Sequence, residues 1–262
     1  MSGASVPAIE LFAVAKRYGD RSAVDGLSLR VAPGECLMLV GGSGSGKTTT
    51  LKLVNRLIEP TAGRIEVEGV DVRGVPGPEL RRRIGYGFQS VGLFPHLTVA
   101  ENVGITPELL GWDGARVRAR TDELLALLEL PPGEFRDRRP HELSGGQAQR
   151  VGLARALAGG ARILLLDEPF GALDPATRDR LQESFARIRS ELAPTVVFVT
   201  HDMAEALLLA DRIAVLRAGR LVQLAAPAEV LARPADAGVR ELFDGPRRQA
   251  RALLGLAGEA AP

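Results

Sequence analysis

The stretch GGSGSGKT, residues 41–48, is the most informative part of the sequence. It fits the pattern G-x-x-x-x-G-K-[ST], in which a glycine-rich loop and the first turn of a helix present backbone N–H groups to phosphate oxygens. The apolar run CLMLV directly before it predicts a strand, and TTTLKLVNRLIE, which begins at its last residue, predicts a helix with one apolar face. Because the context is correct on both sides, we expect a phosphate-binding loop rather than a flexible Gly/Ser turn.

Each residue of this loop has an expected task in holding a nucleotide. Lys47 is expected to reach the β- and γ-phosphates, and the hydroxyl of Thr48 is expected to hold Mg²⁺. The other positions contribute backbone N–H groups to the same anion cradle. The predicted nucleotide-binding residues of this segment are Gly41, Gly42, Ser43, Gly44, Ser45, Gly46, Lys47, Thr48 and Thr49.

The segment ILLLDEP, residues 163–169, predicts the acidic half of the same site. Its apolar run predicts a buried strand that delivers Asp167 and Glu168 at its carboxyl end. Asp167 is expected to bind magnesium, directly or through water, and Glu168 to polarise an attacking water. The alternative, a strand that simply ends in two solvated acids, is much weaker once a phosphate loop is present in the same chain.

Short β-type runs alternate with amphipathic helical stretches along the chain, which favours an α/β fold around a largely parallel sheet. The predicted strands are Cys36–Val40, Arg64–Glu68, Ile84–Gln89, Ile163–Asp167, Thr195–Thr200 and Ile213–Arg217. Residues 8–35 alternate with a period of two and predict antiparallel strands at the edge of this core. From about Thr98 to Gly159 the periodicity is helical, which indicates a helical insertion, and the tail from Pro246 onward is expected to fray.

The composition excludes several classes of protein. With 45% hydrophobic and 25% charged residues, the chain is in the range of ordinary globular proteins. The 33 basic and 32 acidic residues give no excess of positive charge for binding nucleic acid. Cys36 is the single cysteine, so a reducing compartment is expected. No apolar run is long enough to span a bilayer and the start lacks the pattern of a signal peptide, so we expect a cytoplasmic location.

The segment LSGGQ, residues 143–147, narrows the choice of family. It matches the signature of ATP-binding-cassette ATPases and lies upstream of ILLLDEP at the spacing that this family uses. The chain resembles the family over nearly its whole length. The resemblance implies a P-loop NTPase of the RecA-like type, with an antiparallel β subdomain at its edge and an inserted helical subdomain. It also implies ATP and Mg²⁺ as ligands.

The same segment has a local structural interpretation. S-x-x-Q is a helix capping box, with Ser144 as N-cap and Gln147 at the third helical position. The two interpretations are compatible, because a capped helix N-terminus that starts with Gly145 and Gly146 is itself a phosphate-binding surface. In the family, this surface meets the γ-phosphate of the nucleotide held by the other subunit, so the resemblance implies a homodimer with composite sites.

Four further residues match landmarks of the family in the same order along the chain. Tyr18 matches the aromatic residue that stacks on adenine, and Gln89 matches the glutamine that touches magnesium and the attacking water. Asp174 matches the loop that joins the two sites, and His201 matches the histidine that contacts the γ-phosphate. Alone, Tyr18 is equally well a packed or turn tyrosine, and His201 an ordinary strand-end histidine. The implied catalytic residues are Lys47, Glu168 and His201, and the implied metal ligands are Thr48, Gln89 and Asp167.

The resemblance also implies a domain organisation. Residues 1–245 are expected to form the ATPase domain, with 1–90 and 160–245 as the nucleotide-binding core with its β subdomain. Residues 91–159 are expected to form the helical subdomain that carries the signature. Residues 246–262 are expected to be a short tail, without the regulatory nucleotide-sensing domains that many relatives carry.

Segments such as PELRRRIGYGFQSVGLFPHLTVAENVG are similar to the sequences of the ATPase subunits of osmoprotectant importers. These importers take up glycine betaine, choline, carnitine and related quaternary amines. This resemblance implies a subunit at the cytoplasmic face of the membrane, bound to permease subunits and served indirectly by an extracytoplasmic substrate-binding protein. The ATPase of a polar amino-acid importer is the main alternative. A soluble, non-transport ATPase of the same family and a small-molecule kinase fit the motifs less well.

Two features near Gln89 complete the expectations. The apolar segment Ser90–Trp112 is interpreted either as packing within the helical insertion or as a groove for a cytoplasmic helix of the permease, with Leu93, Phe94 and Leu97 as contacts. Gly87 stands where an apolar β-branched residue is expected, which predicts a weakened strand.

Overall fold

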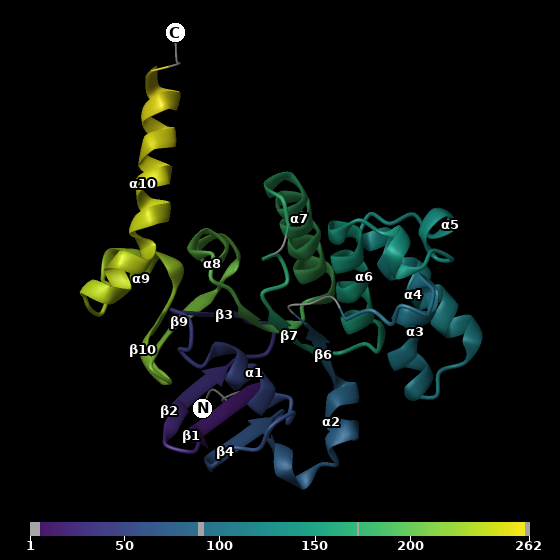
Figure 1. Ribbon diagram of the computed structural model, residues 1–262, viewed down its shortest axis with the longest axis horizontal. Coiled ribbons are helices and arrows are strands. Elements are labelled where there is room, and N and C mark those ends of the chain that lie inside the picture. The colour runs from purple at the N-terminus through teal and green to yellow at the C-terminus, as the bar shows by residue number, and fades with distance from the viewer. Residues whose placement is uncertain (1–5, 89–91, 172, 260–262) are drawn as a thin grey trace, which may run out of the picture.

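The computed structural model describes residues 6–88, 92–171 and 173–259, and it contains two sheets with helices around them (Figure 1). The first sheet is antiparallel, with strand order β2-β1-β4-β5. Its strands are β1 (Ile9–Tyr18), β2 (Arg21–Val31), β4 (Ala62–Val67) and β5 (Val70–Asp71). The second sheet has the order β10-β9-β3-β8-β7-β6. Its strands are β3 (Cys36–Val40), β6 (Ile84–Gly87), β7 (Ile163–Asp167), β8 (Thr195–Val199), β9 (Arg212–Arg217) and β10 (Arg220–Ala225).

The second sheet is the predicted parallel core. Strands β6, β7, β8, β3 and β9 pair in parallel, and β10 pairs with β9 antiparallel. The predicted strands Cys36–Val40 and Ile163–Asp167 have the observed bounds, and every residue of β3, β7 and β8 is buried. A sheet covered on both faces requires such unbroken apolar runs, which explains why these strands were visible in the sequence.

Two strands differ from the expectations. The predicted strand Arg64–Glu68 corresponds to β4, which lies in the antiparallel sheet because it pairs with β1. Strand β10 was not predicted. It is joined to β9 by a tight turn in which Ala218 and Gly219 have positive φ angles. Gly87 is the last residue of β6, where it pairs with Leu166, and a Cβ at this position would lie 2.7 Å from Leu166 Cδ2.

Helices surround both sheets. They are α1 (Lys47–Val54), α2 (Gly77–Arg83), α3 (Val99–Leu109), α4 (Gly114–Leu127), α5 (Pro132–Phe135), α6 (Gly145–Ala158), α7 (Pro175–Leu192), α8 (Met203–Leu209), α9 (Pro227–Ala232) and α10 (Ala237–Glu259), with 3-10 turns at Val72–Gly74 and Pro140–Glu142. Residues 98–159 contain only helices and turns, as the sequence predicts. The capping residues Thr98 and Asp113 each accept a backbone N–H bond at the start of α3 and α4.

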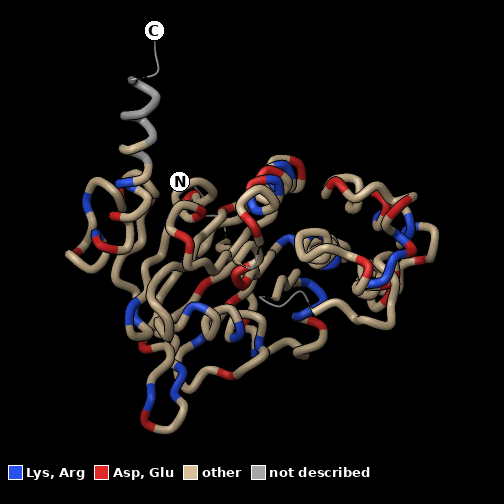
Figure 2. Tube along the Cα trace, turned by 45° about the horizontal axis from the view of Figure 1, so that its top comes forward, with Lys and Arg blue, Asp and Glu red and all other residues tan. Residues whose placement is uncertain are grey.

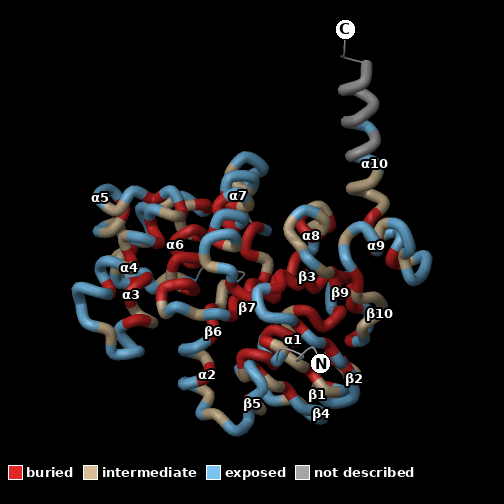
Figure 3. The backbone as a smooth tube through the Cα atoms, turned by 180° about the vertical axis from the view of Figure 1, so that it is seen from behind, coloured by how far each residue is buried: buried red, intermediate tan, exposed pale blue. Residues whose placement is uncertain are grey.

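The two faces of the parallel sheet bury separate apolar clusters. Alternate residues of each strand point to opposite faces, so Met38 packs with α6, α7 and α8, while Leu37 and Leu39 pack with α1 and the antiparallel sheet. Figure 3 shows the buried residues along β3, β7 and β9. Cys36 belongs to the first cluster, and burial raises the pKa of its thiol to about 12, so it behaves as a small apolar side chain.

The C-terminal tail is helical rather than frayed. Helix α10 begins at Ala237, passes through Pro246 and extends away from the rest of the molecule (Figure 1). Its first turns are anchored because Val239 and Phe243 are buried in the core. Among the described residues, no helix has the length and apolar character that crossing a membrane requires.

Charged residues of both signs lie on all parts of the molecule (Figure 2), in line with the 33 basic and 32 acidic residues of the sequence. The structure therefore adds no support for a nucleic-acid-binding face.

Candidate nucleotide-binding site

The loop between β3 and α1 requires glycine at several positions. Gly41, Gly44 and Gly46 have φ angles of 144°, 74° and 101°, which side chains disfavour. A Cβ on Gly41 would lie 2.1 Å from the Leu216 carbonyl oxygen, and one on Gly46 would lie 2.5 Å from that of Ala23. The loop is thus pressed against its neighbours, with its shape fixed by backbone contacts.

Lys47 lies inside this loop. Its side chain is buried, and its Nζ donates hydrogen bonds to the carbonyl oxygens of Gly41 (2.8 Å) and Gly42 (3.1 Å). Burial lowers the pKa of Lys47, while the nearby carboxylates of Glu168 and Asp167 act in the opposite direction. The ammonium group is therefore held at the base of an anion cradle.

Two predicted metal ligands lie together. Thr48 Oγ1 donates a hydrogen bond of 3.0 Å to Asp167 Oδ1, which joins the start of α1 to the end of β7. Burial raises the pKa of Asp167, and the bond from Thr48 partly offsets this. A hydroxyl and a carboxylate are hard oxygen donors of the kind that Mg²⁺ prefers, so this pair fits the ion. The third predicted ligand, Gln89, lies outside the described residues.

The described residues contain no cluster of three or more His, Cys, Asp and Glu side chains that could hold a metal ion by themselves. Mg²⁺ is usually held by one or two carboxylates together with substrate phosphates, so an all-protein cage is not required for the proposed role.

Glu168 and His201 meet at the ends of neighbouring strands. The His201 Nδ1 atom lies 3.2 Å from Glu168 Oε2, and the two side chains are 62% and 22% exposed. Glu168 adopts a positive φ of 48°, and its backbone N–H donates to the Val199 carbonyl oxygen over 2.9 Å. This turn directs the Glu168 side chain out of the sheet, next to the histidine.

A cavity of about 860 Å³ brings most of the predicted site together. Its lining residues are Tyr18, Arg21, Ala23, Gly41 to Thr49, Glu168, His201, Met203 and Leu242. Tyr18 is 53% exposed, so one face of the ring is available for stacking. The volume is within the range of small-ligand sites, and one end is lined by a loop suited to phosphate.

Four lining residues were missed by the sequence reasoning: Arg21, Ala23, Met203 and Leu242. Arg21 Nη2 would lie 3.1 Å from a Cβ placed on Gly44, so this side chain reaches the glycine-rich loop. Its position three residues after Tyr18 is the sequence signal that could have identified it. Leu242 comes from α10, and nothing in its local sequence indicates that it reaches the cavity.

The signature segment lies apart from this cavity. Ser144 Oγ accepts the Gln147 N–H, and Gln147 Oε1 accepts the Ser144 N–H at 2.9 Å, which confirms the predicted capping box. Ser144 and Gly145 are exposed. Gly146 is buried, and a Cβ on it would lie 2.2 Å from Thr177 Cγ2. The α6 N-terminus is thus available to a ligand that this chain's own cavity does not hold.

Asp174, the remaining predicted residue, also lies outside the cavity lining and caps α7. Its side chain accepts the backbone N–H of Thr177 at 3.1 Å, and hydrogen bonding to the side chain and then the backbone of Thr177 lowers the pKa of the Asp174 carboxyl. The first turn of α7 therefore carries the Asp174 loop and contacts the signature segment through Thr177.

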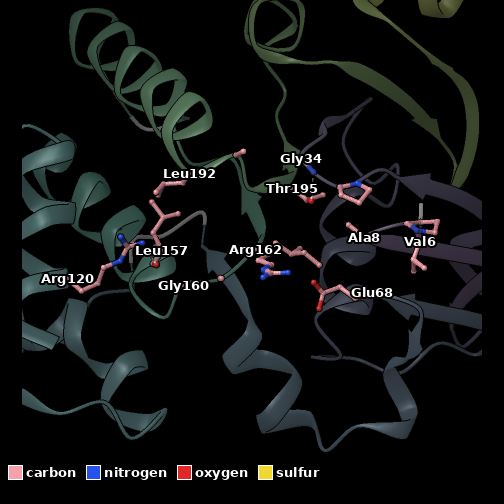
Figure 4. A pocket seen from close by; sticks show the side chains of 15 residues that line it. Val6, Ala8, Gly34, Glu68, Arg120, Leu157, Gly160, Arg162, Leu192 and Thr195 are labelled. Atoms are coloured by element: carbon pink, nitrogen blue, oxygen red, sulfur yellow. Dashed lines mark hydrogen bonds between the residues drawn. The ribbon is translucent and has the colours of Figure 1, made fainter. Parts of the chain in front are cut away.

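A second cavity, of about 550 Å³, lies at the opposite edge of the sheet, where β7 and β8 begin (Figure 4). Glu68, Arg120 and Arg162 are its charged lining residues, and Thr195 lines it together with apolar side chains and glycines. None of the predicted site residues lines it. The carboxyl edge of the sheet, where ligands of α/β folds usually bind, is therefore the candidate site.

Comparisons with known proteins agree with this geometry. The family described as ABC transporter matches residues 24–171. The choline transport ATP-binding protein OpuBA of Bacillus subtilis is 51% identical over 231 residues, which cover 88% of this chain and 60% of that protein. The glycine betaine uptake system ATP-binding protein YehX of Escherichia coli is 50% identical, over 90% of this chain and 76% of that protein. The chain spans about 60% of the length of several curated relatives that it matches.

A solved structure shares the fold. The dimeric post-hydrolysis state of the ATP-binding cassette MJ0796, bound to ADP and Pi, has a TM-score of 0.75 and 34% sequence identity, and the match covers 84% of this chain and 98% of that one. The fold is therefore that of an ATP-binding cassette, as the resemblance implied. The family match, the identity to transport ATP-binding proteins and the shared fold show that this chain belongs to the ABC transporter family of ATP-binding proteins.

Proposed function

We propose that the chain is the ATP-hydrolysing subunit of an importer for an osmoprotectant such as glycine betaine, choline or another quaternary amine. The enzymatic part is supported by two contacts: Thr48 with Asp167, and Glu168 with His201. Thr48, Glu168 and His201 line the same cavity. The substrate class is supported by relatives with about 50% identity whose names state choline or glycine betaine transport.

Binding of ATP follows from the loop and the rim of the cavity. The backbone N–H groups of the glycine-rich loop and of the first turn of α1 bind the phosphates. Lys47 exchanges its bonds to the Gly41 and Gly42 carbonyls for bonds to phosphate oxygens. The exposed ring of Tyr18 stacks on the base.

Hydrolysis requires positioning and neutralisation of charge more than covalent chemistry. Mg²⁺, when bound, neutralises charge on the phosphates, and Thr48 and Asp167 are the residues that would hold it, with Gln89 as a further ligand. Glu168 orients the attacking water and accepts its proton, while His201, held 3.2 Å from Glu168, contacts the γ-phosphate.

The site is completed by a second copy of the chain. The N-terminus of α6 is formed by Ser144, Gly145 and Gly146, which are absent from the lining of the chain's own cavity, and Gln147 completes the capping box. We assign this surface to the γ-phosphate of the nucleotide on the other copy, with the Asp174 loop between the two sites. Two copies that close around two nucleotides convert binding energy into motion.

A groove suited to the permease lies beside β6. It has a volume of about 450 Å³, and Leu57, Phe88 and Phe94, each more than 40% exposed, line it. The backbone at Phe94 is fixed by Asn102, whose Oδ1 accepts the Phe94 N–H at 2.8 Å. Of the three contacts predicted from the sequence, Phe94 lines the groove, Leu93 packs against the core and Leu97 is absent from the lining.

The remaining parts of the proposal follow from this assignment. We place the subunit at the cytoplasmic face of the membrane, where it would bind permease subunits and serve a substrate-binding protein indirectly, without binding nucleic acid. Residues 1–90 and 160–245 are assigned to the nucleotide-binding core, 91–159 to the helical subdomain, and 246–262 to the tail.

Reconstitution tests the substrate class. The chain is combined in liposomes with the permease and binding protein encoded beside it, and ATP turnover is titrated with glycine betaine, choline and polar amino acids. Subunits carrying Glu168→Gln provide the inactive control. We expect glycine betaine or choline to stimulate turnover. Stimulation of ATP turnover by amino acids alone would favour an amino-acid importer. A rate of ATP turnover that changes neither with the permease nor with any substrate would contradict a transport role.

A further inference from the structure

A network of charged and polar side chains holds the residues that flank His201 in the chain. The side chains of this network do not line the nucleotide cavity. Arg178, one turn into α7, donates from Nη1 to Asp202 Oδ2 at 3.2 Å and from Nη2 to the Leu173 carbonyl oxygen at 3.3 Å. Leu173 immediately precedes Asp174. One guanidinium group therefore joins the Asp174 loop to the residue that follows His201.

The residues on both sides of His201 are held by the same network. Thr200 Oγ1 donates to Glu205 Oε2 at 2.6 Å and accepts the Asp202 N–H at 2.9 Å. Asp202 Oδ1 accepts the N–H groups of Ala204 and Glu205, which caps α8. His201 thus lies between two anchored neighbours, while its own side chain is 62% exposed.

Arg178 is the cation that this network depends on. Glu205 is 5% exposed, and its Oε1 lies 3.9 Å from Arg178 Nε, an atom that is buried without a hydrogen-bond partner. Burial raises the pKa of Glu205, and Asp202 adds to the effect, whereas Arg178 lowers it. Removing the guanidinium would leave two neighbouring acids without their shared cation, which destabilises a partly buried site.

The same helix also contacts the signature segment. Thr177, adjacent to Arg178, packs against Gly146 so closely that a Cβ on Gly146 would overlap it. The first turn of α7 is therefore the element that touches both the surface assigned to the other copy's nucleotide and the loop that carries this copy's His201.

We propose that Arg178 is a positioning residue that couples the start of α7 to the His201 loop and keeps His201 beside Glu168 during turnover. The effect on turnover rests on the proposed function, whereas the effect on the loop does not. Arg178 is not among the residues that line the nucleotide cavity, so its loss is expected to affect turnover rather than ATP affinity.

The first measurement is amide hydrogen exchange on the full chain. Arg178→Met is compared with wild type and with Arg180→Met, a matched control on the same helix. Arg180 is exposed, and its side chain makes no hydrogen bond or ion pair within the described residues. We expect the amides of Asp202, Ala204 and Glu205 to exchange about 10-fold faster in Arg178→Met only. Unchanged exchange at these amides would overturn the proposal.

The second measurement separates turnover from binding. We expect Arg178→Met to lower kcat by about 10-fold or more with the Kd for ATP within about 2-fold, and Arg178→Lys to recover part of the loss. Combining Arg178→Met with Asp202→Asn should cost no more than the larger single effect. The proposal would be overturned if Arg178→Met left kcat unchanged or weakened ATP binding as much as it lowered kcat. It would also be overturned if the losses of the two single variants multiplied in the double variant. Failure of wild type to bind ATP would refute the proposed function, while the exchange result would still decide the coupling.

Discussion

Lys47 shows how strongly a single position can be constrained. Only Lys16, Lys47 and Lys52 are lysines among the 33 basic residues, so arginine is the usual cation of this chain. At position 47 the side chain is enclosed by its own loop and bonds to the Gly41 and Gly42 carbonyls. A compact ammonium group fits this space, whereas a planar guanidinium is larger and has fixed donor directions.

We therefore expect Lys47→Arg to abolish measurable ATP binding even though the charge is kept. A loss of affinity of about 100-fold or more is expected, because the phosphates lose a buried charge-assisted bond and the loop is distorted. Isothermal titration calorimetry with ATP measures it. Lys52→Arg, on the exposed face of the same helix, is the matched control and should bind ATP as wild type does. Equal affinity of the two variants would contradict the placement of Lys47.

Glu168 is the residue to which we assign acceptance of the proton from the attacking water. Because Glu168 lies beside His201 and follows Asp167 in the chain, we expect that Glu168→Gln lowers ATP turnover by about 100-fold or more, since an amide cannot accept the proton of the attacking water. Binding of ATP should persist, since Gln has nearly the same size. Phosphate release and ATP titration measure the two quantities. Unchanged turnover would show that the role assigned to Glu168 is wrong.

At the scale of elements, buried strands were the most predictable features. The runs CLMLV and ILLLD have no polar interruption until their carboxyl ends, and they became β3 and β7 with the expected bounds. Partly exposed elements were harder: β10 has only one fully buried residue, so its sequence lacks a strong apolar pattern. Helix α10 was not predicted, and the segment from Pro246 onward was expected to fray because it is rich in small residues.

The anchor of α10 is predicted to depend on acid. Two bonds from Arg217 and one from the Val239 N–H lower the pKa of Asp236 from 3.8 to about 2. A lowered pKa in the folded state means that the stabilisation is present above the ordinary pKa and is lost as the pH falls towards the folded value. The pair should therefore stabilise α10 at neutral pH and lose this effect between about pH 4 and pH 2.

Asp236→Asn isolates this pair, because Asn still caps the helix but carries no charge. The melting temperature of the variant should lie below that of wild type at neutral pH, and the difference should shrink below about pH 4. Calorimetry over a pH series measures the difference. A difference that stays constant or grows in acid would contradict the assigned pair.

At the scale of the whole molecule, the candidate site was predictable in parts but not as an arrangement. The loop at 41–48 and the acids at 167 and 168 follow from local patterns, and the topology of the parallel sheet brings them to one edge. No local pattern indicates that Leu242 lines the cavity or that Arg178 holds the His201 loop, because both contacts join elements distant in sequence. The family resemblance had implied that the signature meets the nucleotide of the other copy, and the signature is absent from the lining of this chain's own cavity.

Attachment to the permease is tested at the groove beside β6. A cysteine placed at Phe94 should crosslink to a cytoplasmic helix of the permease, because the side chain is exposed and its backbone is fixed by Asn102. Cys36 is buried and should remain silent. A cysteine at exposed Leu208, on α8, is the surface control. Strong crosslinking at Leu208 with none at Phe94 would contradict the assigned docking surface.

The composite nucleotide site, in which the α6 N-terminus of one copy meets the nucleotide of the other, is tested by a substitution at Gly145. Gly145 is exposed, and a Cβ on it meets no atom within 4 Å, so Gly145→Asp should fold normally. An acid at the first position of α6 also favours the helix N-terminus. The same carboxylate would repel the phosphates of a nucleotide held by the other copy, so closure of the dimer should fail although each chain still binds ATP.

Sedimentation of the Glu168→Gln chain with ATP and Mg²⁺ tests this claim most directly. We expect the Glu168→Gln chain to form dimers with two bound ATP molecules, and the chain that also carries Gly145→Asp to remain an ATP-bound monomer. A Glu168→Gln chain that binds ATP and remains a monomer, or a dimer that tolerates Gly145→Asp, would contradict it.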